Sequence, residues 1–248
     1  MKVLVLTALG LLTAFAGGVL AQGAASPSPS PSPSTSAIHA DHLILGIRDL
    51  DEGMRRFEQR TGVRPVPGGV HPGRGTRNAL VSLGPGLYIE ILAPQAGVPD
   101  SARADGLKTL ADLTPMGWAV SVRDIAGVRK RLTGAGFGLG AMMPGARARP
   151  DGRRLSWQTF EIEKPPLAGV PFFIRWGDGT THPSQDSPAG CRLDALRVLT
   201  PNDGDLRRAF AALPLEVPVE KAVRPGMELA LRCPKGTVRF AGDAPPLP

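Results

Sequence analysis

One pattern recurs three times along this chain: an apolar strand, a helix that begins near Asp or Asn, and then further strand-like runs. The strands DHLILGI, MGWAVSV and CRLDALRV end about 75 residues apart, at Ile47, Val122 and Val198. An Asp or Asn follows each strand within a few residues, and these residue types cap the first turn of a helix. Repetition at one interval indicates a duplicated unit. We therefore predict an α+β protein built from repeated βαβββ modules.

The repeat also predicts how the modules assemble. A four-stranded sheet with one helix leaves one face uncovered, and pairing two such sheets gives a half-open, cup-shaped barrel with a concave pocket. We place the first module at residues 38–100, the second at 114–180 and a βαβββ-like third at 190–243. The third unit packs either within the chain or against a second copy, and a homodimer stays open.

The N-terminus has the pattern of an export signal. Residues 1–21 combine Lys2 with an apolar run and small residues at its end, which is typical of a signal peptide. An uncleaved membrane anchor is the alternative. Residues 22–37 are rich in Ser and Pro and predict an extended linker. Export to the periplasm or the medium would place Cys191 and Cys233 in an oxidising compartment, where they form a disulfide or stay as buried thiols.

Two ionisable residues interrupt apolar strands in the first module. His42 lies in DHLILGI and Glu90 lies in LYIEILAP. Because strand residues alternate between faces, His42 shares a face with Ile44, and Glu90 shares one with Tyr88. Each polar group needs a partner or ligand if it is buried. The pair is therefore either part of a site in the cup or a structural His–Glu pair.

The segments DHLILGIRDL, HPGRGTRNAL and YIEILAP resemble the vicinal-oxygen-chelate superfamily, and more narrowly its glyoxalase-like domain branch. The resemblance runs from about Asp41 to Gly177. It implies paired βαβββ modules around a divalent metal ion (Zn, Ni, Mn or Fe) held by His or Glu on the first and last strands of each module. Carried over, His42 and Glu90 are the metal ligands of the first module, and His71 is the candidate third ligand.

The second module departs from this pattern. Gly117 falls opposite His42, and Ile174 or Arg175 falls opposite Glu90. None of these three residues supplies a metal ligand. Because a tight first-row metal site usually takes at least three protein ligands, a cup without any metal is the alternative.

Aromatic and cationic residues suggest what the cup binds. Trp118 and Trp176 supply apolar area, Arg175 can pair with an anionic or carbonyl group, and Tyr88 lies two residues from Glu90. We predict a protein that binds a small organic ligand, with metal-assisted lyase or isomerase chemistry in which Glu90 moves a proton. A non-catalytic protein that sequesters an aromatic or hydrophobic compound is the alternative, and catalysis itself stays open.

The net charge of +7 suggests a second kind of partner. A basic surface favours weak association with an anionic cell envelope, and a basic envelope-interaction module is the third reading. The arginines are scattered along the chain without a nucleic-acid-binding motif, so we expect no nucleic-acid partner.

Overall fold

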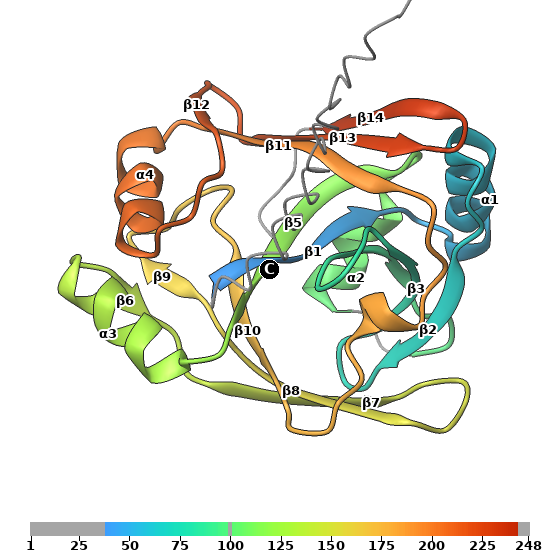
Figure 1. Ribbon diagram of the computed structural model, residues 1–248, viewed down its shortest axis with the longest axis horizontal. Coiled ribbons are helices and arrows are strands. Elements are labelled where there is room, and N and C mark those ends of the chain that lie inside the picture. Colours follow the sequence, from blue (N-terminus) through green and yellow to red (C-terminus); the bar gives the residue numbers. More distant parts are fainter. Residues whose placement is uncertain (1–37, 99–100, 243–248) are drawn as a thin grey trace, which may run out of the picture. The chain divides into compact units, whose positions relative to one another are not determined.

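The structure is a computed structural model that describes residues 38–98 and 101–242, all of which belong to one compact unit (Figure 1). The predicted signal peptide and linker lie outside these described residues and stay predictions. Across the described ranges, no helix is both long enough and apolar enough to span a membrane.

The first module has the predicted order of a strand, a helix and three strands. Its elements are β1 (Ile38–Gly46), α1 (Leu50–Thr61), β2 (Val66–His71), β3 (Thr76–Ser82) and β4 (Tyr88–Pro94). Helix α1 begins where the Asp49 side chain accepts a hydrogen bond from the Glu52 amide at 2.8 Å, and it ends at Gly62, which adopts a left-handed conformation. Its buried residues, Leu50 and Phe57 among them, face the sheet.

The second module repeats this order with extra short strands. Helix α2 (Ala102–Lys108) precedes it, and its elements are β5 (Thr114–Val122), α3 (Ile125–Gly134), β6 (Gly138–Leu139), β7 (Met143–Ala148), β8 (Arg154–Phe160), β9 (Ile162–Lys164) and β10 (Phe172–Trp176). The Asp124 side chain accepts from the Gly127 amide at 2.8 Å, which confirms the predicted cap of α3. The sequence pattern had not indicated β7, whose MPGARA run combines a proline, a glycine and no apolar alternation.

The two modules share one eight-stranded sheet with the order β2-β3-β4-β1-β5-β10-β8-β7. Within each module the first strand lies parallel to the last, β1 to β4 and β5 to β10. The two halves join where β1 runs antiparallel to β5, with His42 opposite Ala119. The predicted α+β class and barrel-like pairing of modules are confirmed, and the pairing occurs within a single chain.

The two edge strands, β2 and β7, approach each other and nearly close this sheet into a barrel. The Arg147 guanidinium on β7 donates to the Gly68 carbonyl on β2. A Cβ atom on Gly69 would lie 2.8 Å from the Ala148 carbonyl oxygen, and the φ of Gly69 is +130°. Only glycine meets both conditions, so Gly69 allows the seam to form.

The third unit has the predicted element order but a different sheet. It follows the short 3-10 helix η1 (Pro183–Gln185) and contains β11 (Arg192–Thr200), α4 (Asp203–Ala212), β12 (Val219–Lys221), β13 (Gly226–Cys233) and β14 (Gly236–Gly242). Its strands pair in the order β12-β11-β13-β14, with β11 parallel to the second strand of the unit and not to the last. Asn202 lies at the start of α4, but its side chain forms no cap hydrogen bond there.

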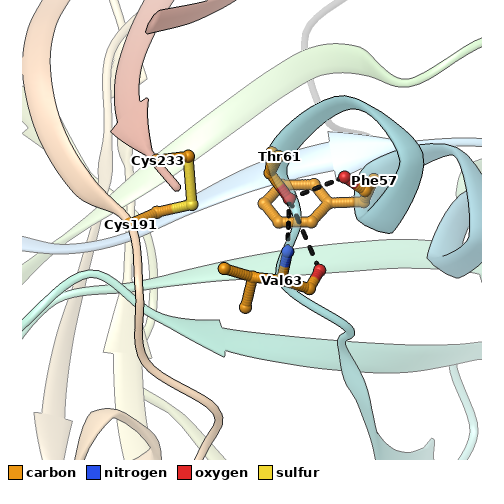
Figure 2. Close-up of a disulfide and its surroundings, with 5 residues drawn as sticks. All are labelled: Phe57, Thr61, Val63, Cys191 and Cys233. Atoms are coloured by element: carbon orange, nitrogen blue, oxygen red, sulfur yellow. Dashed lines mark hydrogen bonds between the residues drawn. A yellow bond between two sulfur atoms is a disulfide. The ribbon is translucent and has the colours of Figure 1, made fainter. Parts of the chain in front are cut away.

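The third unit packs against the first module of the same chain. Cys191 and Cys233 form a disulfide that joins the chain before β11 to the end of β13 (Figure 2). Phe57 of α1 stacks on Phe240 of β14 with ring centroids 5.9 Å apart. The Lys235 amide donates to the carbonyl at the end of α1 at 3.2 Å. The third unit therefore packs within its own chain, which was one of the two arrangements that the sequence left open.

Candidate functional site

A chain of alternating imidazoles and carboxylates runs through the centre of the first module. Asp41, His42 and Glu90 are 0%, 4% and 7% exposed. His42 contacts a carboxylate on each side: Nδ1 lies 2.7 Å from Asp41, and Nε2 lies 3.7 Å from Glu90. His182 and His71 extend the chain beyond these two carboxylates. Each buried charge in the chain therefore has a polar partner.

Asp41 is the anchor at one end of this chain. Its carboxylate faces His42 Nδ1 at 2.7 Å, Trp176 Nε1 at 2.9 Å and His182 Nε2 at 3.3 Å. Burial alone would raise the pKa of Asp41, but hydrogen bonds from His182 and His42 outweigh it and hold that pKa well below its ordinary value. Asp41 is therefore a fixed negative charge that orients two imidazoles and an indole.

Glu90 lies between two imidazoles at the other end. His42 Nε2 is 3.7 Å from its Oε2, and His71 Nε2 is 3.4 Å from its Oε1. The Asn78 amide also donates to Oε1 at 2.6 Å. Burial opposes ionisation, but His71, His42, the Asn78 hydrogen bond and the charge of Arg147 together lower the pKa of Glu90. Glu90 is therefore a carboxylate at neutral pH.

A pocket opens beside this chain on the concave side of the barrel. It contains about 640 Å³ of space outside the protein atoms, part of it open to solvent. Polar and charged lining side chains come from the first module and from Arg147, Thr159 and Glu161 of the second, and the other lining side chains are apolar or aromatic. The lining comprises His42, Ile44, His71, Arg74, Asn78, Tyr88, Glu90, Leu92, Arg147, Trp157, Thr159, Glu161, Phe172, Ile174 and Trp176.

Tyr88 adds a neutral hydroxyl to the polar side. Its ring stacks on His42 with centroids 4.7 Å apart, and Phe172 meets the same imidazole edge-on at 5.3 Å. Burial and the charges of Asp41 and Glu90 raise the pKa of Tyr88. Tyr88 therefore keeps its proton at neutral pH and is a hydrogen-bond donor beside the pocket.

Five of the residues singled out from the sequence line this pocket: His42, His71, Tyr88, Glu90 and Trp176. Their roles in metal or ligand binding stay predictions.

Two other candidates lie outside the pocket. Trp118 is buried in the main core, where its Nε1 donates to the Gly169 carbonyl at 3.0 Å. The Arg175 guanidinium lies 3.5 Å from the Asp178 carboxylate, and Arg175 is not among the residues that line this pocket. The cause is strand alternation, because Ile174 and Trp176 face the cup and the residue between them must face away.

Four polar residues of the site were not singled out as site residues from the sequence: Asp41, Asn78, Arg147 and His182. Asp41 precedes His42, so strict alternation places it on the opposite face. A register shift between Ala40 and His42 in the pairing with β5 breaks this alternation and brings the two side chains together. The sequence signal that could have indicated Asp41 is a charged residue directly before the candidate ligand His42 in an otherwise apolar strand.

The side chains around Glu90 can be compared with the ligand set that the predicted metal ion needs. Among the described residues, no three or more His, Cys, Asp or Glu side chains form a group that could hold one. The Asn78 amide nitrogen lies 2.6 Å from Glu90 Oε1 and 3.3 Å from His71 Nε2, between the atoms a shared ion would bind. The arrangement does not fit the predicted divalent ion, and no step below depends on a metal.

Two βαβββ modules around a cup with histidine and glutamate in its wall define a protein of the vicinal-oxygen-chelate class. The sequence profile described as "Glyoxalase-like domain" matches residues 40–213, and the chain belongs to this family. A search of curated proteins found no match.

Solved structures of similar fold were also found. A hypothetical protein from Staphylococcus aureus superposes with a TM-score of 0.57 at 15% identity, over 85% of this chain and 87% of that one. Methylmalonyl-CoA epimerase from Mycobacterium tuberculosis gives a TM-score of 0.43 at 20% identity, over 59% of this chain and 92% of the epimerase. The epimerase from Streptomyces coelicolor gives 0.42 at 17% identity, over 57% and 96%.

Proposed function

We propose that the cup binds a small organic carbonyl compound and that Glu90 transfers a proton at the carbon next to the carbonyl. The observation that carries this proposal is the position of Glu90. It is an ionised carboxylate in the pocket wall, held between the Nε2 atoms of His42 and His71. A buried carboxylate that faces a ligand pocket is suited to act as a general base.

The proposed step moves one proton and two electron pairs. Glu90 takes the proton from the carbon, the C–H electron pair becomes the carbon–carbon double bond of an enolate, and the carbonyl electron pair moves to oxygen. Tyr88 keeps its proton and can donate a hydrogen bond to that oxygen. The protonated Glu90 then exchanges its proton with solvent and returns a solvent-derived proton to the same carbon, so the net reaction is hydrogen exchange at that carbon.

The two flanking histidines and Asn78 prepare Glu90 for this step. The Asn78 amide donates to Glu90 Oε1 at 2.6 Å, and the Nε2 atoms of His42 and His71 lie 3.7 and 3.4 Å from the two carboxylate oxygens; these neighbours favour the ionised carboxylate. Asp41 holds His42 through Nδ1, which leaves Nε2 directed at Glu90. The first module thus supplies Glu90 and the polar groups around it, and Phe172 and Ile174 of the second shield part of this region from water.

Proton exchange in heavy water tests this proposal. Phenylpyruvate and phenylacetone carry the same benzylic protons next to a carbonyl, and proton NMR reports their replacement by deuterium. We expect the protein to accelerate exchange of at least one probe over buffer, and Glu90→Gln to lower that rate by about a hundredfold or more. Glu216→Gln, at an exposed position outside the pocket, is the matched control and should exchange like the wild type.

The outcomes separate the candidate functions. Exchange at the buffer rate with both probes, or equal exchange by Glu90→Gln, would contradict the assignment of Glu90 as the base. Binding without exchange would favour the alternative, a non-catalytic protein that sequesters the ligand.

We also propose that the protein is exported. The apolar segment within residues 1–21 supports this, and the Cys191–Cys233 disulfide suits an oxidising compartment. Cell fractionation with an antibody to the folded unit tests it. Recovery of the protein in the cytosol with the first 21 residues intact would overturn the proposal.

A further inference from the structure

Arg147 is a buried cation that has no carboxylate within ion-pair distance in the part of the chain that the structure describes. It lies on β7, is 5% exposed and lines the pocket. Its Nη1 donates to the Gly68 carbonyl across the seam of the barrel. Within residues 38–98 and 101–242, no carboxylate oxygen forms an ion pair with Arg147. The charge of Glu90 acts on Arg147 without direct contact, so the guanidinium has no charge-assisted hydrogen bond to a carboxylate, which sets Arg147 apart.

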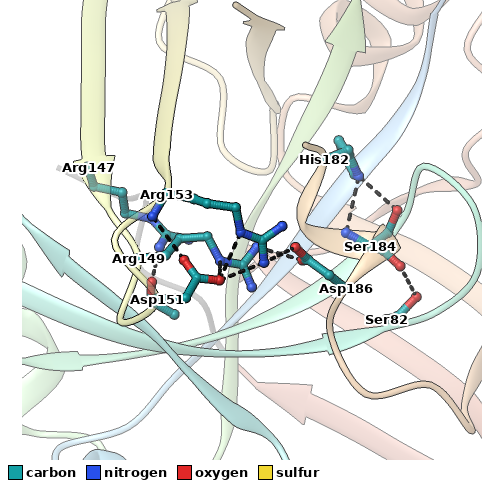
Figure 3. Close-up of polar contacts among 9 residues, drawn as sticks. Ser82, Arg147, Arg149, Asp151, Arg153, His182, Ser184 and Asp186 are labelled. Atoms are coloured by element: carbon teal, nitrogen blue, oxygen red, sulfur yellow. Dashed lines mark hydrogen bonds and ion pairs between the residues drawn. The ribbon is translucent and has the colours of Figure 1, made fainter. Parts of the chain in front are cut away.

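The next arginines along the chain show the usual arrangement. Arg149 Nη1 lies 2.6 Å from Asp186, and Arg153 Nη2 lies 2.6 Å from Asp151 and 2.9 Å from Asp186. Figure 3 shows this cluster at the β7–β8 turn, with the two carboxylates among the guanidinium groups of Arg149 and Arg153. Asp151 and Asp186 are thus occupied by Arg149 and Arg153, and Arg147 is left for another partner.

Two nitrogen atoms of Arg147 are free to contact a ligand. Its Nε and Nη2 form no hydrogen bond within the described part of the chain, yet neither is among the fully buried polar atoms without a partner. Both nitrogens therefore keep some exposed surface, and Arg147 is one of the residues that line the pocket. The Nε and Nη2 edge of a guanidinium is a fork that binds a carboxylate through two parallel hydrogen bonds.

We propose that Arg147 is a carboxylate-binding subsite and that the ligand is a small organic acid with one negative charge and an apolar or aromatic body. This inference rests on the proposed function, because it places the acid in the same cup. Glu90 is close enough to Arg147 for each charge to affect the other, so a dianion would be repelled. Trp157, Phe172 and Ile174 provide the apolar wall for the body.

Binding of a matched pair of probes tests the proposal without any reaction. Phenylacetate and phenylacetamide have nearly the same shape but differ in charge, and neither needs to exchange a proton. Calorimetry, together with quenching of the tryptophans that line the pocket, measures both dissociation constants. We expect the wild type to bind phenylacetate about ten- to a hundredfold more tightly than the amide, as a charge-assisted forked pair should.

Three variants locate this preference. Arg147→Met should reduce the affinity for phenylacetate at least tenfold and leave phenylacetamide nearly unchanged. Arg147→Lys keeps the charge but loses the fork, and it should retain part of the preference. Arg192→Met removes one exposed positive charge outside the pocket and should behave like the wild type.

The wild-type comparison keeps the test valid even if Arg147→Met is poorly folded. Equal binding of the two probes, absence of phenylacetate binding, or an undiminished preference in a folded Arg147→Met would each overturn the carboxylate subsite. A preserved preference for phenylacetate together with no proton exchange would instead refute only the proposed reaction.

Discussion

Replacing Asp41 with Asn would remove a fully buried negative charge while changing the side-chain volume little. Asp41 faces the donor nitrogens of His42, Trp176 and His182 at 2.7, 2.9 and 3.3 Å. An Asn side chain has only one acceptor oxygen. Its NH₂ group would replace the other carboxylate oxygen and would face a nitrogen that, in the wild type, contacts that oxygen. At least one buried donor would then lose its partner.

The expected loss of stability follows from these contacts. Disrupting a buried ion pair by removing one charged partner costs about 3–5 kcal/mol. For a chain of this size, such a loss lowers the melting temperature by about 6 to 20 °C. Urea unfolding at pH 7 measures the free energy, and a scanning melt measures the temperature.

The pH dependence gives an independent check. Because the pKa of Asp41 is lowered in the folded protein, its stabilisation is complete above the ordinary carboxyl pKa of 3.8 and is lost as the pH falls through the folded value. The difference in stability between wild type and Asp41→Asn should therefore shrink as the pH falls below about 4.

Asp178→Asn is the matched control. Its side chain is 98% exposed and lies 3.5 Å from Arg175, so the same chemical change should move the melting temperature by less than about 1 °C. A loss below about 1 kcal/mol for Asp41→Asn at pH 7, or a loss that grows as the pH falls below about 4, would refute the view that Asp41 is an ionised anchor.

Three further outcomes are expected. Cys191→Ser combined with Cys233→Ser should lower the unfolding free energy by about 4 kcal/mol for a loop of this length, measured in urea without reductant, and an unchanged midpoint would contradict the reasoning. Phe57→Ala removes a fully buried ring at the contact with the third unit and should cost about 3–5 kcal/mol in the same assay. Elemental analysis after incubation with Zn, Ni, Mn or Fe should find no stoichiometric ion, and an equivalent lost in both His42→Ala and Glu90→Ala would show that the donor set does hold a metal.

Local sequence signals predicted most of the first two modules. Apolar runs marked β1, β4 and β5, and the caps Asp49 and Asp124 marked two helix starts, because these features act within a few residues. The pairing of the third unit could not be predicted, since strand order along the chain does not determine hydrogen-bonded neighbours. Strand β7 was missed because its role comes from its partner strands and not from its own pattern.

The site residues could be predicted only where an ionisable residue interrupts an apolar run within one short segment of the sequence. His42 and Glu90 stood out because each interrupts an apolar strand. His182 reaches Asp41 across 141 positions of the chain, and Arg147 reaches Gly68 across 79. Contacts of that range depend on the closed sheet, so no local pattern in the sequence indicates them.

The unequal halves of the barrel have a stereochemical consequence. The imidazoles and Glu90 come from the first module, whereas the second presents Phe172 and Ile174 to the same space. A flat enolate bound between such walls meets a proton donor on one side and hydrocarbon on the other. In the proposed reaction, only one of two prochiral hydrogens should therefore be replaced by deuterium, and the monodeuterated product should be a single enantiomer.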